Sequence, residues 1–190
     1  MERLTNYSSD TLKALAGTFI SSVLPAMAAA HPSADFNWRG NTQAFAQEYA
    51  KALIGTGCTG RHIREAVDAM KVRSAYERQP PNAQEFKILC LQAKGMPTID
   101  ECIDEIDRQR REHYGKRHKE WSSPFVYWLN VSVAAPRRIM SEAQWRKLAR
   151  RKYSELAEVY ARNEIRDIPV PVECKLEPPY MRYLTQGSAS

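Results

Sequence analysis

The chain has 190 residues, of which 43% are hydrophobic and 26% are charged. These values are typical of a globular protein with one domain or two small ones, and they exclude a globally disordered chain. The net charge of +6 is compatible with an acidic partner, but it is too modest to establish nucleic-acid binding.

A first helix is predicted from Asp10, as its cap, to about Ala29. Residues 14–30 carry no charge and end in three alanines, which is also typical of a secretory signal. The larger apolar residues share one face of the helix, whereas a signal core is apolar all round, so the pattern favours a helix of a folded domain. No other segment approaches the ~20 apolar residues of a membrane span, and we expect no membrane partner.

Two more helices are predicted in the first half of the chain. The second runs from about Thr42 to Ile54, and the third from Thr59 to about Tyr76. Pro80-Pro81 then imposes an extended break. We therefore expect an N-terminal helical subdomain at 1–79 and a C-terminal one at 80–166.

Capping patterns start the helices of the second half. Asn82 with Glu85 starts the fourth helix, which is expected to end at Gly95. Thr98 with Glu101 starts the fifth, which is expected to run into the charged stretch 108–119.

Two helices complete the expected fold. Ser123-Pro124 starts the sixth, the most apolar segment of the chain, and Ser141 starts a long seventh helix to about Arg166. Four prolines then predict an extended or disordered arm at 167–190. The sequence thus predicts an all-α protein of about seven helices in two subdomains, followed by an extended proline-rich C-terminal arm.

Motifs for catalysis or cofactor binding are absent from the sequence. It contains no phosphate-binding loop, no dinucleotide fingerprint, no nucleophile elbow and no zinc-protease motif. Its four cysteines form no pair with metal-ligand spacing. We therefore expect a protein that is not an enzyme and that needs no cofactor or metal.

Basic residues gather around the start of the seventh helix. The candidates for a charged contact are Arg137, Arg138, Arg146, Lys147, Arg150 and Arg151. Such a surface suits a phosphate backbone or an acidic protein surface, and the sequence leaves both open. A solvated helix face is the simplest alternative.

Aromatic residues mark the sixth helix. Phe125, Tyr127 and Trp128 are spread over several helix faces, so at least one of them is expected at the surface. Exposed aromatic rings can stack on single-stranded bases, but the pattern favours core packing or a protein interface.

Four stretches, in this order, suggest a family. They are 80–86 closing with Cys90, the turn Gly95-Met-Pro97, the segment 123–130, and Met140-Ser-Glu-Ala leading into the long helix that ends in 168–171. Their order and spacing resemble the replication protein P family of phage lambda and its relatives, which are helicase loaders without ATPase activity.

The resemblance implies a phage or prophage replication protein in the cytoplasm of a bacterial host. Such a protein binds the hexameric replicative helicase of the host, opens its ring or holds it open, restrains its activity and delivers it to origin DNA. A phage origin-binding initiator and single-stranded DNA are further candidate partners. The candidates for helicase binding are Phe125, Tyr127, Trp128, Tyr180, Met181, Tyr183 and Leu184. The alternative is a basic helical DNA-binding protein, either a regulator or an initiator accessory factor.

Overall fold

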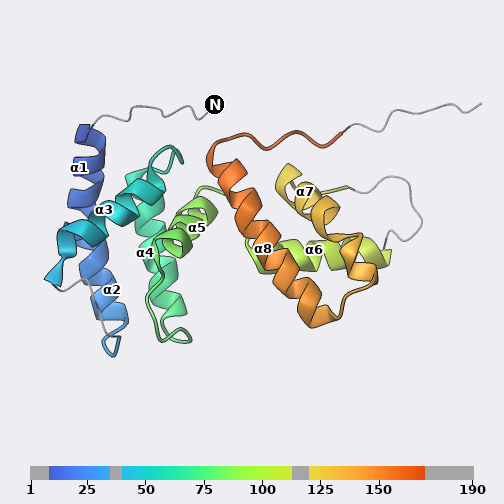
Figure 1. Ribbon diagram of the computed structural model, residues 1–190, viewed down its shortest axis with the longest axis horizontal. Helices are drawn as coiled ribbons and strands as arrows, with labels where there is room; N and C mark the ends of the chain where they lie inside the picture. Colours follow the sequence, from blue (N-terminus) through green and yellow to red (C-terminus); the bar gives the residue numbers. More distant parts are fainter. Residues whose placement is uncertain (1–8, 35–39, 113–119, 170–190) are drawn as a thin grey trace, which may run out of the picture.

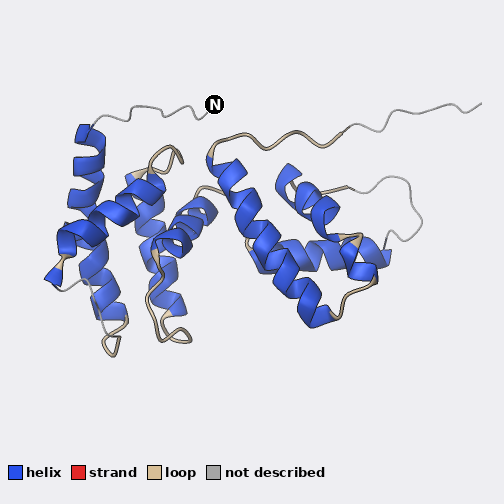
Figure 2. Ribbon diagram, in the orientation of Figure 1, coloured by secondary structure: helices blue, strands red, loops and turns tan. Residues whose placement is uncertain are grey.

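A computed structural model of the chain describes residues 9–34, 40–112 and 120–169, and these residues form helices and loops without a strand (Figure 2). The helices are α1 (Ser9–Thr18), α2 (Leu24–Ala30), α3 (Thr42–Leu53), α4 (Gly60–Arg73), α5 (Ala83–Ala93), α6 (Ile99–Glu112), α7 (Pro124–Val133) and α8 (Glu142–Ala161). A π-helical turn, η1 (Phe19–Val23), joins α1 to α2, and a 3₁₀ turn, η3 (Pro136–Arg138), follows α7. The prediction of an all-α protein with about seven helices is confirmed for this part of the chain.

The first helix is continuous from Ser9 to Ala30 but contains the π-helical turn. Pro25 explains the position of this turn, because proline has no backbone N–H and its ring clashes with the carbonyl four residues earlier. Within the turn the N–H of Leu24 donates to the carbonyl of Phe19, five residues back. The helix therefore accommodates the proline and continues rather than ending there.

The N-terminal helix has the length and mean hydropathy of a membrane span, and it is the one helix in the described ranges that does. Core helices of folded domains and signal sequences also meet these criteria. One face of the helix lies in the hydrophobic core through Phe19, Val23, Leu24 and Met27, which are all at most 1% exposed. This packing agrees with the prediction of a domain helix.

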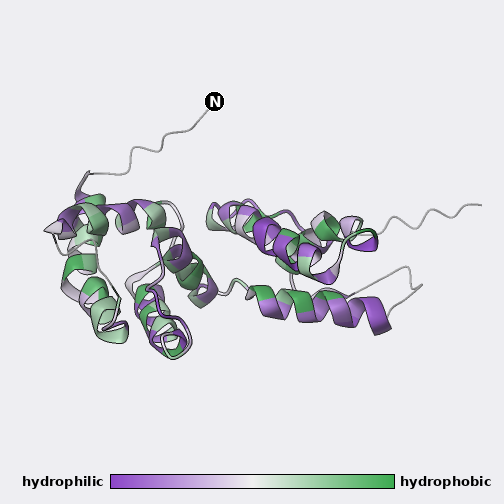
Figure 3. Cartoon of the chain, turned by 60° about the horizontal axis from the view of Figure 1, so that its bottom comes forward, coloured by the Kyte–Doolittle hydropathy of each residue, from purple (hydrophilic) through white to green (hydrophobic). Residues whose placement is uncertain are grey.

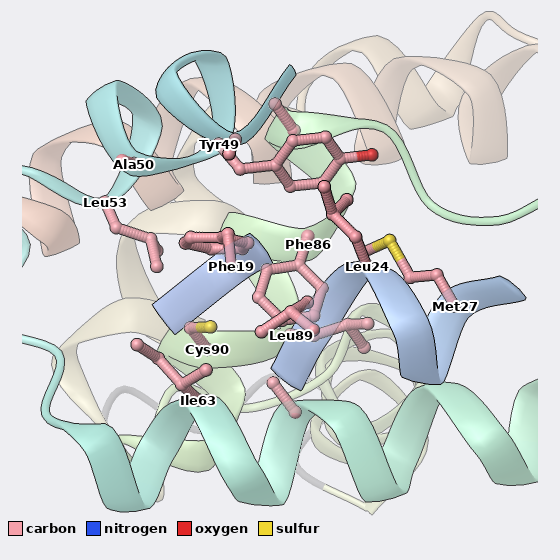
Figure 4. Packing of buried hydrophobic residues seen from close by; sticks show 14 of the residues in the cluster. Phe19, Leu24, Met27, Tyr49, Ala50, Leu53, Ile63, Phe86, Leu89 and Cys90 are labelled. Atoms are coloured by element: carbon pink, nitrogen blue, oxygen red, sulfur yellow. The ribbon is translucent and has the colours of Figure 1, made fainter. Parts of the chain in front are cut away.

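The first core is built by the N-terminal helix together with α3, α4 and α5 (Figure 1). Phe19, Tyr49 and Phe86 form an aromatic triad at its centre, with ring centroids 5.5 to 6.0 Å apart and inclined rings (Figure 4). The hydroxyl of Tyr49 donates a hydrogen bond to the carbonyl of Pro81 at 2.7 Å. Burial raises the pKa of Tyr49 to about 12, so the hydroxyl remains a donor at neutral pH.

The second core is built by α6, α7 and α8 (Figure 1). Trp145 of α8 is fully buried, and its indole N–H donates to the carbonyl of Val133 at the end of α7. The inner side of α6 contributes Cys102, Ile103 and Ile106. Its last turns are hydrophilic and extend beyond this core (Figure 3).

Helix α5 contributes to both cores, so the predicted boundary at Pro80-Pro81 does not coincide with the division between them. Phe86, Leu89 and Cys90 belong to the first core, whereas Leu91 belongs to the second. The reason is that Pro81 is itself bonded to α3 through Tyr49, so 80–81 is a packed loop rather than a linker. The cores divide close to the turn that ends α5.

The contact between α5 and α8 contains polar bonds as well as the apolar packing of Leu91. Lys87 pairs with Glu158, and Gln92 donates to the hydroxyl of Tyr153 at 3.0 Å. Lys94 donates to the carbonyl of Thr56 at 2.7 Å, in the turn that leads into α4, and to the side chain of Asn163 beyond α8 at 3.1 Å. These bonds join the two cores in addition to the apolar packing of Leu91 in the second core.

Candidate protein-interaction surface

The start of helix α7 is determined by local sequence signals, and the helix contains no charged residue. The hydroxyl of Ser123 caps it by accepting from the N–H of Val126, and Pro124 occupies its first turn. Its ten residues read PFVYWLNVSV. A helix on the surface of a globular protein normally carries charged residues on its outer side, so α7 departs from the usual pattern.

The inner side of α7 belongs to the second core. Phe125, Val126, Leu129 and Val133 are at most 2% exposed. The ring of Phe125 lies edge-on to Tyr153, with centroids 5.3 Å apart. Because this side chain is enclosed, the structure removes Phe125 from the predicted helicase-binding residues and assigns it to the core.

The outer side of α7 is also uncharged. Tyr127, Val131 and Ala134 follow one another at helical spacing opposite the buried residues, and we call them the α7 outer face. Val131 is 49% exposed, Ala134 is exposed and Tyr127 is half-buried. Beyond η3, Ile139 is 88% exposed and Met140 is 39% exposed. Apolar side chains therefore continue from α7 to the start of α8.

Tyr127 and Trp128 are held by their neighbours. The ring of Tyr127 lies edge-on to Trp121 and to Trp128, at centroid distances of 6.2 and 5.0 Å. The indole N–H of Trp128 donates to the carbonyl of Arg166 at 2.8 Å. Both candidates are half-buried rather than enclosed. Because their neighbours already restrict their rotamers, binding a partner would cost less side-chain conformational entropy.

The structure assigns Arg137 to the support of the second core. Its side chain is only 14% exposed, its Nη1 lies 2.5 Å from a carboxylate oxygen of Asp107 on α6, and it contacts Glu142 at 3.4 Å. The guanidinium carbon lies 3.7 Å from the centre of the Trp145 ring, a cation–π contact. Arg137 is thus a structural residue, and its prediction as a free surface cation is corrected.

The other basic candidates are exposed. Arg146 pairs with Glu142 at 2.8 Å, and Arg151 lies 3.8 Å from Glu155. Arg138, Lys147 and Arg150 form no ion pair within the described ranges. The predicted candidates Tyr180, Met181, Tyr183 and Leu184 lie outside the described residues.

The described residues hold no group of three or more potential metal ligands. Burial raises the pKa of the thiols of Cys90 and Cys102, so both are protonated at neutral pH and pack as core residues. An open cavity of about 550 Å³ beside the turn after α5 contains two carboxylates. Glu101 accepts from the cap residue Thr98, and Glu105 accepts from Ser122, so both are engaged in structural bonds.

Sequence reasoning missed three parts of this surface. Val131 continues the row of Tyr127 by one helical turn, and this spacing could have identified it. Ile139 and Met140 lie in the link between helices, where periodicity gives no signal. Arg166 was expected inside the last helix, but α8 ends at Ala161, which leaves the Arg166 carbonyl free to accept from Trp128.

Comparison with protein-family models, with curated proteins and with solved structures gives no match for the chain. Inference about function therefore depends on the residues and surfaces described above.

Proposed function

We propose that this chain is a replication protein of a phage or prophage and acts as a helicase loader without ATPase activity. It binds the hexameric replicative helicase of the host, opens its ring or holds it open, restrains its activity and delivers it to origin DNA. The observation that supports this function is the α7 outer face, an uncharged and exposed helix face that suits a protein partner. That this partner is a replicative helicase is inferred from the order of the sequence motifs, which resembles that of the replication protein P family.

The α7 outer face has the properties of an interface centre. Aromatic residues are enriched and charged residues are depleted at such centres. The small side chain of Ala134 allows a second helix to approach closely, and Val131 offers an apolar side chain for burial, as does Ile139 beyond η3. Burying a valine or isoleucine side chain fully contributes roughly 1.5–3 kcal/mol, so this small surface can contribute measurably to affinity.

A loader that hydrolyses no nucleotide must hold the ring open by binding alone. A ligand shifts a conformational equilibrium only to the extent that it binds the two states with different affinity. The proposed loader therefore binds the open ring more tightly than the closed ring. The difference in affinity would come from the area of contact with the helicase and not from nucleotide hydrolysis. This agrees with a sequence that contains no phosphate-binding loop.

The deciding experiment measures helicase affinity by interferometry for the wild type and two matched variants. Val131→Asp places a charge on the α7 outer face, and Val72→Asp places the same charge on α4, where Val72 is 71% exposed. We expect the wild type and Val72→Asp to bind alike and Val131→Asp to bind at least about tenfold more weakly, since a buried unpaired charge is costly.

The possible outcomes test separately whether the protein binds the helicase and whether α7 is the binding site. Failure of the wild type to bind the helicase contradicts the proposed function. Equal binding by all three proteins supports the function but contradicts α7 as the site. Circular dichroism shows whether each variant keeps its helices. Helicase unwinding assays then test restraint, which the wild type and Val72→Asp should impose and Val131→Asp should impose only weakly.

A further inference from the structure

The outer face of α8 differs in character from that of α7. The residues Lys147, Arg150, Arg151 and Ser154 follow one another at helical spacing, and we call them the α8 outer face. All four are exposed, and none is apolar. The buried residues of the helix are Trp145, Ala149, Tyr153, Ala157 and Ala161, and none of them belongs to this face. The polar character of the outer face is therefore separate from the packing of the helix.

The charge on this face is positive and accessible. Lys147 and Arg150, one helical turn apart, form no ion pair with any residue that the structure describes. Arg151 lies 3.8 Å from Glu155, but its side chain is 68% exposed. An exposed pair of this kind contributes little stability, so the arginine can exchange the glutamate for another anion at small cost.

The composition of the face distinguishes between two kinds of acidic partner. A stable protein–protein interface has an apolar or aromatic centre, and the α8 outer face offers none. Protein–nucleic acid interfaces are more polar and more positively charged, and Arg, Lys and Ser side chains are among those that supply their phosphate contacts. The four residues of the α8 outer face are of these three types, and the acidic residues next to them, Glu155 and Glu158, are paired with Arg151 and Lys87. Its composition therefore favours a nucleic acid.

We propose that the α8 outer face binds the sugar–phosphate backbone of a nucleic acid without reading its bases. The face extends over about 10 Å along the helix, which is enough to reach a few phosphates of one strand. Because no aromatic side chain lies on it, stacking on bases does not contribute there. Single-stranded and double-stranded DNA share the phosphate chemistry, and the two arms of the test distinguish them.

The test measures binding of the full chain, without helicase, to fluorescent oligonucleotides by anisotropy, from about 50 mM to about 200 mM salt. One arm uses a single strand and the other its duplex. Affinity should fall linearly with salt on logarithmic axes, and a scrambled sequence of equal length should bind alike. The double variant Lys147→Gln, Arg150→Gln should bind about tenfold more weakly and show a shallower slope, by about 0.9 per lost duplex contact or 0.7 per lost single-strand contact.

The matched control is Lys51→Gln, Arg64→Gln, which removes the same charge from exposed positions on α3 and α4. It should keep the wild-type affinity and slope. The proposal is overturned if the wild type binds neither oligonucleotide at about 50 mM salt, or if the control loses as much affinity as the α8 variant. It is also overturned if the α8 variant keeps the wild-type DNA affinity. These outcomes concern DNA binding alone, so they do not depend on whether the wild type binds the helicase. If the wild type does bind it, a loss of helicase affinity in a variant that keeps its DNA affinity would assign the face to an acidic protein.

Discussion

The ammonium group of Lys87 on α5 lies 2.5 Å from a carboxylate oxygen of Glu158 on α8, 71 residues later in the chain. The lysine side chain is 9% exposed and that of the glutamate is 47% exposed. The pair therefore joins a buried cation of one core to a half-exposed anion of the other.

Removal of the glutamate carboxylate should destabilise the protein. Glu158→Gln leaves the Lys87 ammonium buried without its anion, and we expect a loss of about 1–2 kcal/mol, less than for a fully buried pair because water reaches Glu158. Lys87→Met removes the buried charge as well and should cost less. Urea unfolding followed by circular dichroism measures both. The control Glu65→Gln, which breaks an exposed pair with Arg61, should have little effect; if it costs as much as Glu158→Gln, burial of Lys87 is not the cause.

Neighbouring arginines should respond differently to the same substitution. Arg137→Gln removes the contact with Trp145 and the pair with Asp107, so we expect a loss of about 2 kcal/mol. Arg137→Lys should restore only part of this stability, because an ammonium cannot reproduce the planar guanidinium. Arg138→Gln should unfold like the wild type. Thermal unfolding of the three variants tests this contrast, and equal midpoints would refute a structural role for Arg137.

The cap of α6 should make part of the stability depend on pH. Hydrogen bonds from the backbone and side chain of Thr98 hold the pKa of Glu101 below its usual value. A carboxyl with a lowered folded pKa stabilises the protein above its unfolded pKa, and this contribution is lost as pH falls through the folded pKa. Glu101→Gln should therefore be destabilising at pH near 7 and nearly neutral well below the usual glutamate pKa of about 4.3. Urea unfolding at both pH values measures it, with Asp104→Asn on the same helix as control.

Deletion of residues 168–190 should weaken helicase binding by about tenfold or more and leave the helices intact. The segment contains the predicted contacts Tyr180, Met181, Tyr183 and Leu184. Their burial would contribute a few kcal/mol, at about 25 cal/mol per Å² of apolar area, less the entropy of ordering the segment. Interferometry compares the helicase affinity of the deletion variant with that of the wild type. Circular dichroism checks that both have the same helix content. Unchanged affinity would show that these residues take no part.

Helix starts were predictable because their signals are local. The capping boxes of Asn82 with Glu85 and of Ser141 with Gln144 form as the sequence indicated. The end of α8 was misplaced: Asn163 adopts a left-handed conformation with φ of 56°, and the backbone of 162–164 turns back on the helix. Asparagine is a known helix terminator in this conformation, so the signal was present but overlooked.

Surface roles were harder to predict because they depend on residues distant in the sequence. Arg137 and Arg138 are adjacent and chemically alike, yet only Arg137 meets Asp107 of α6 and the ring of Trp145. Likewise, Phe125 and Tyr127 differ in exposure because α8 covers one side of α7. Helical periodicity gives the relative directions of such side chains, but it cannot say which direction a neighbouring helix will cover.

The division of α5 between two cores bears on how the protein unfolds. Cys90 and Leu91 are adjacent, yet they lie in different cores and both are fully buried. Any displacement of α5 would expose apolar area in both cores at once. Because α5 supplies buried residues to both cores, unfolding of either core would displace a helix that the other core needs. We therefore expect the two cores to unfold in a single cooperative transition, which hydrogen exchange would report as similar opening free energies for the innermost amides of both halves.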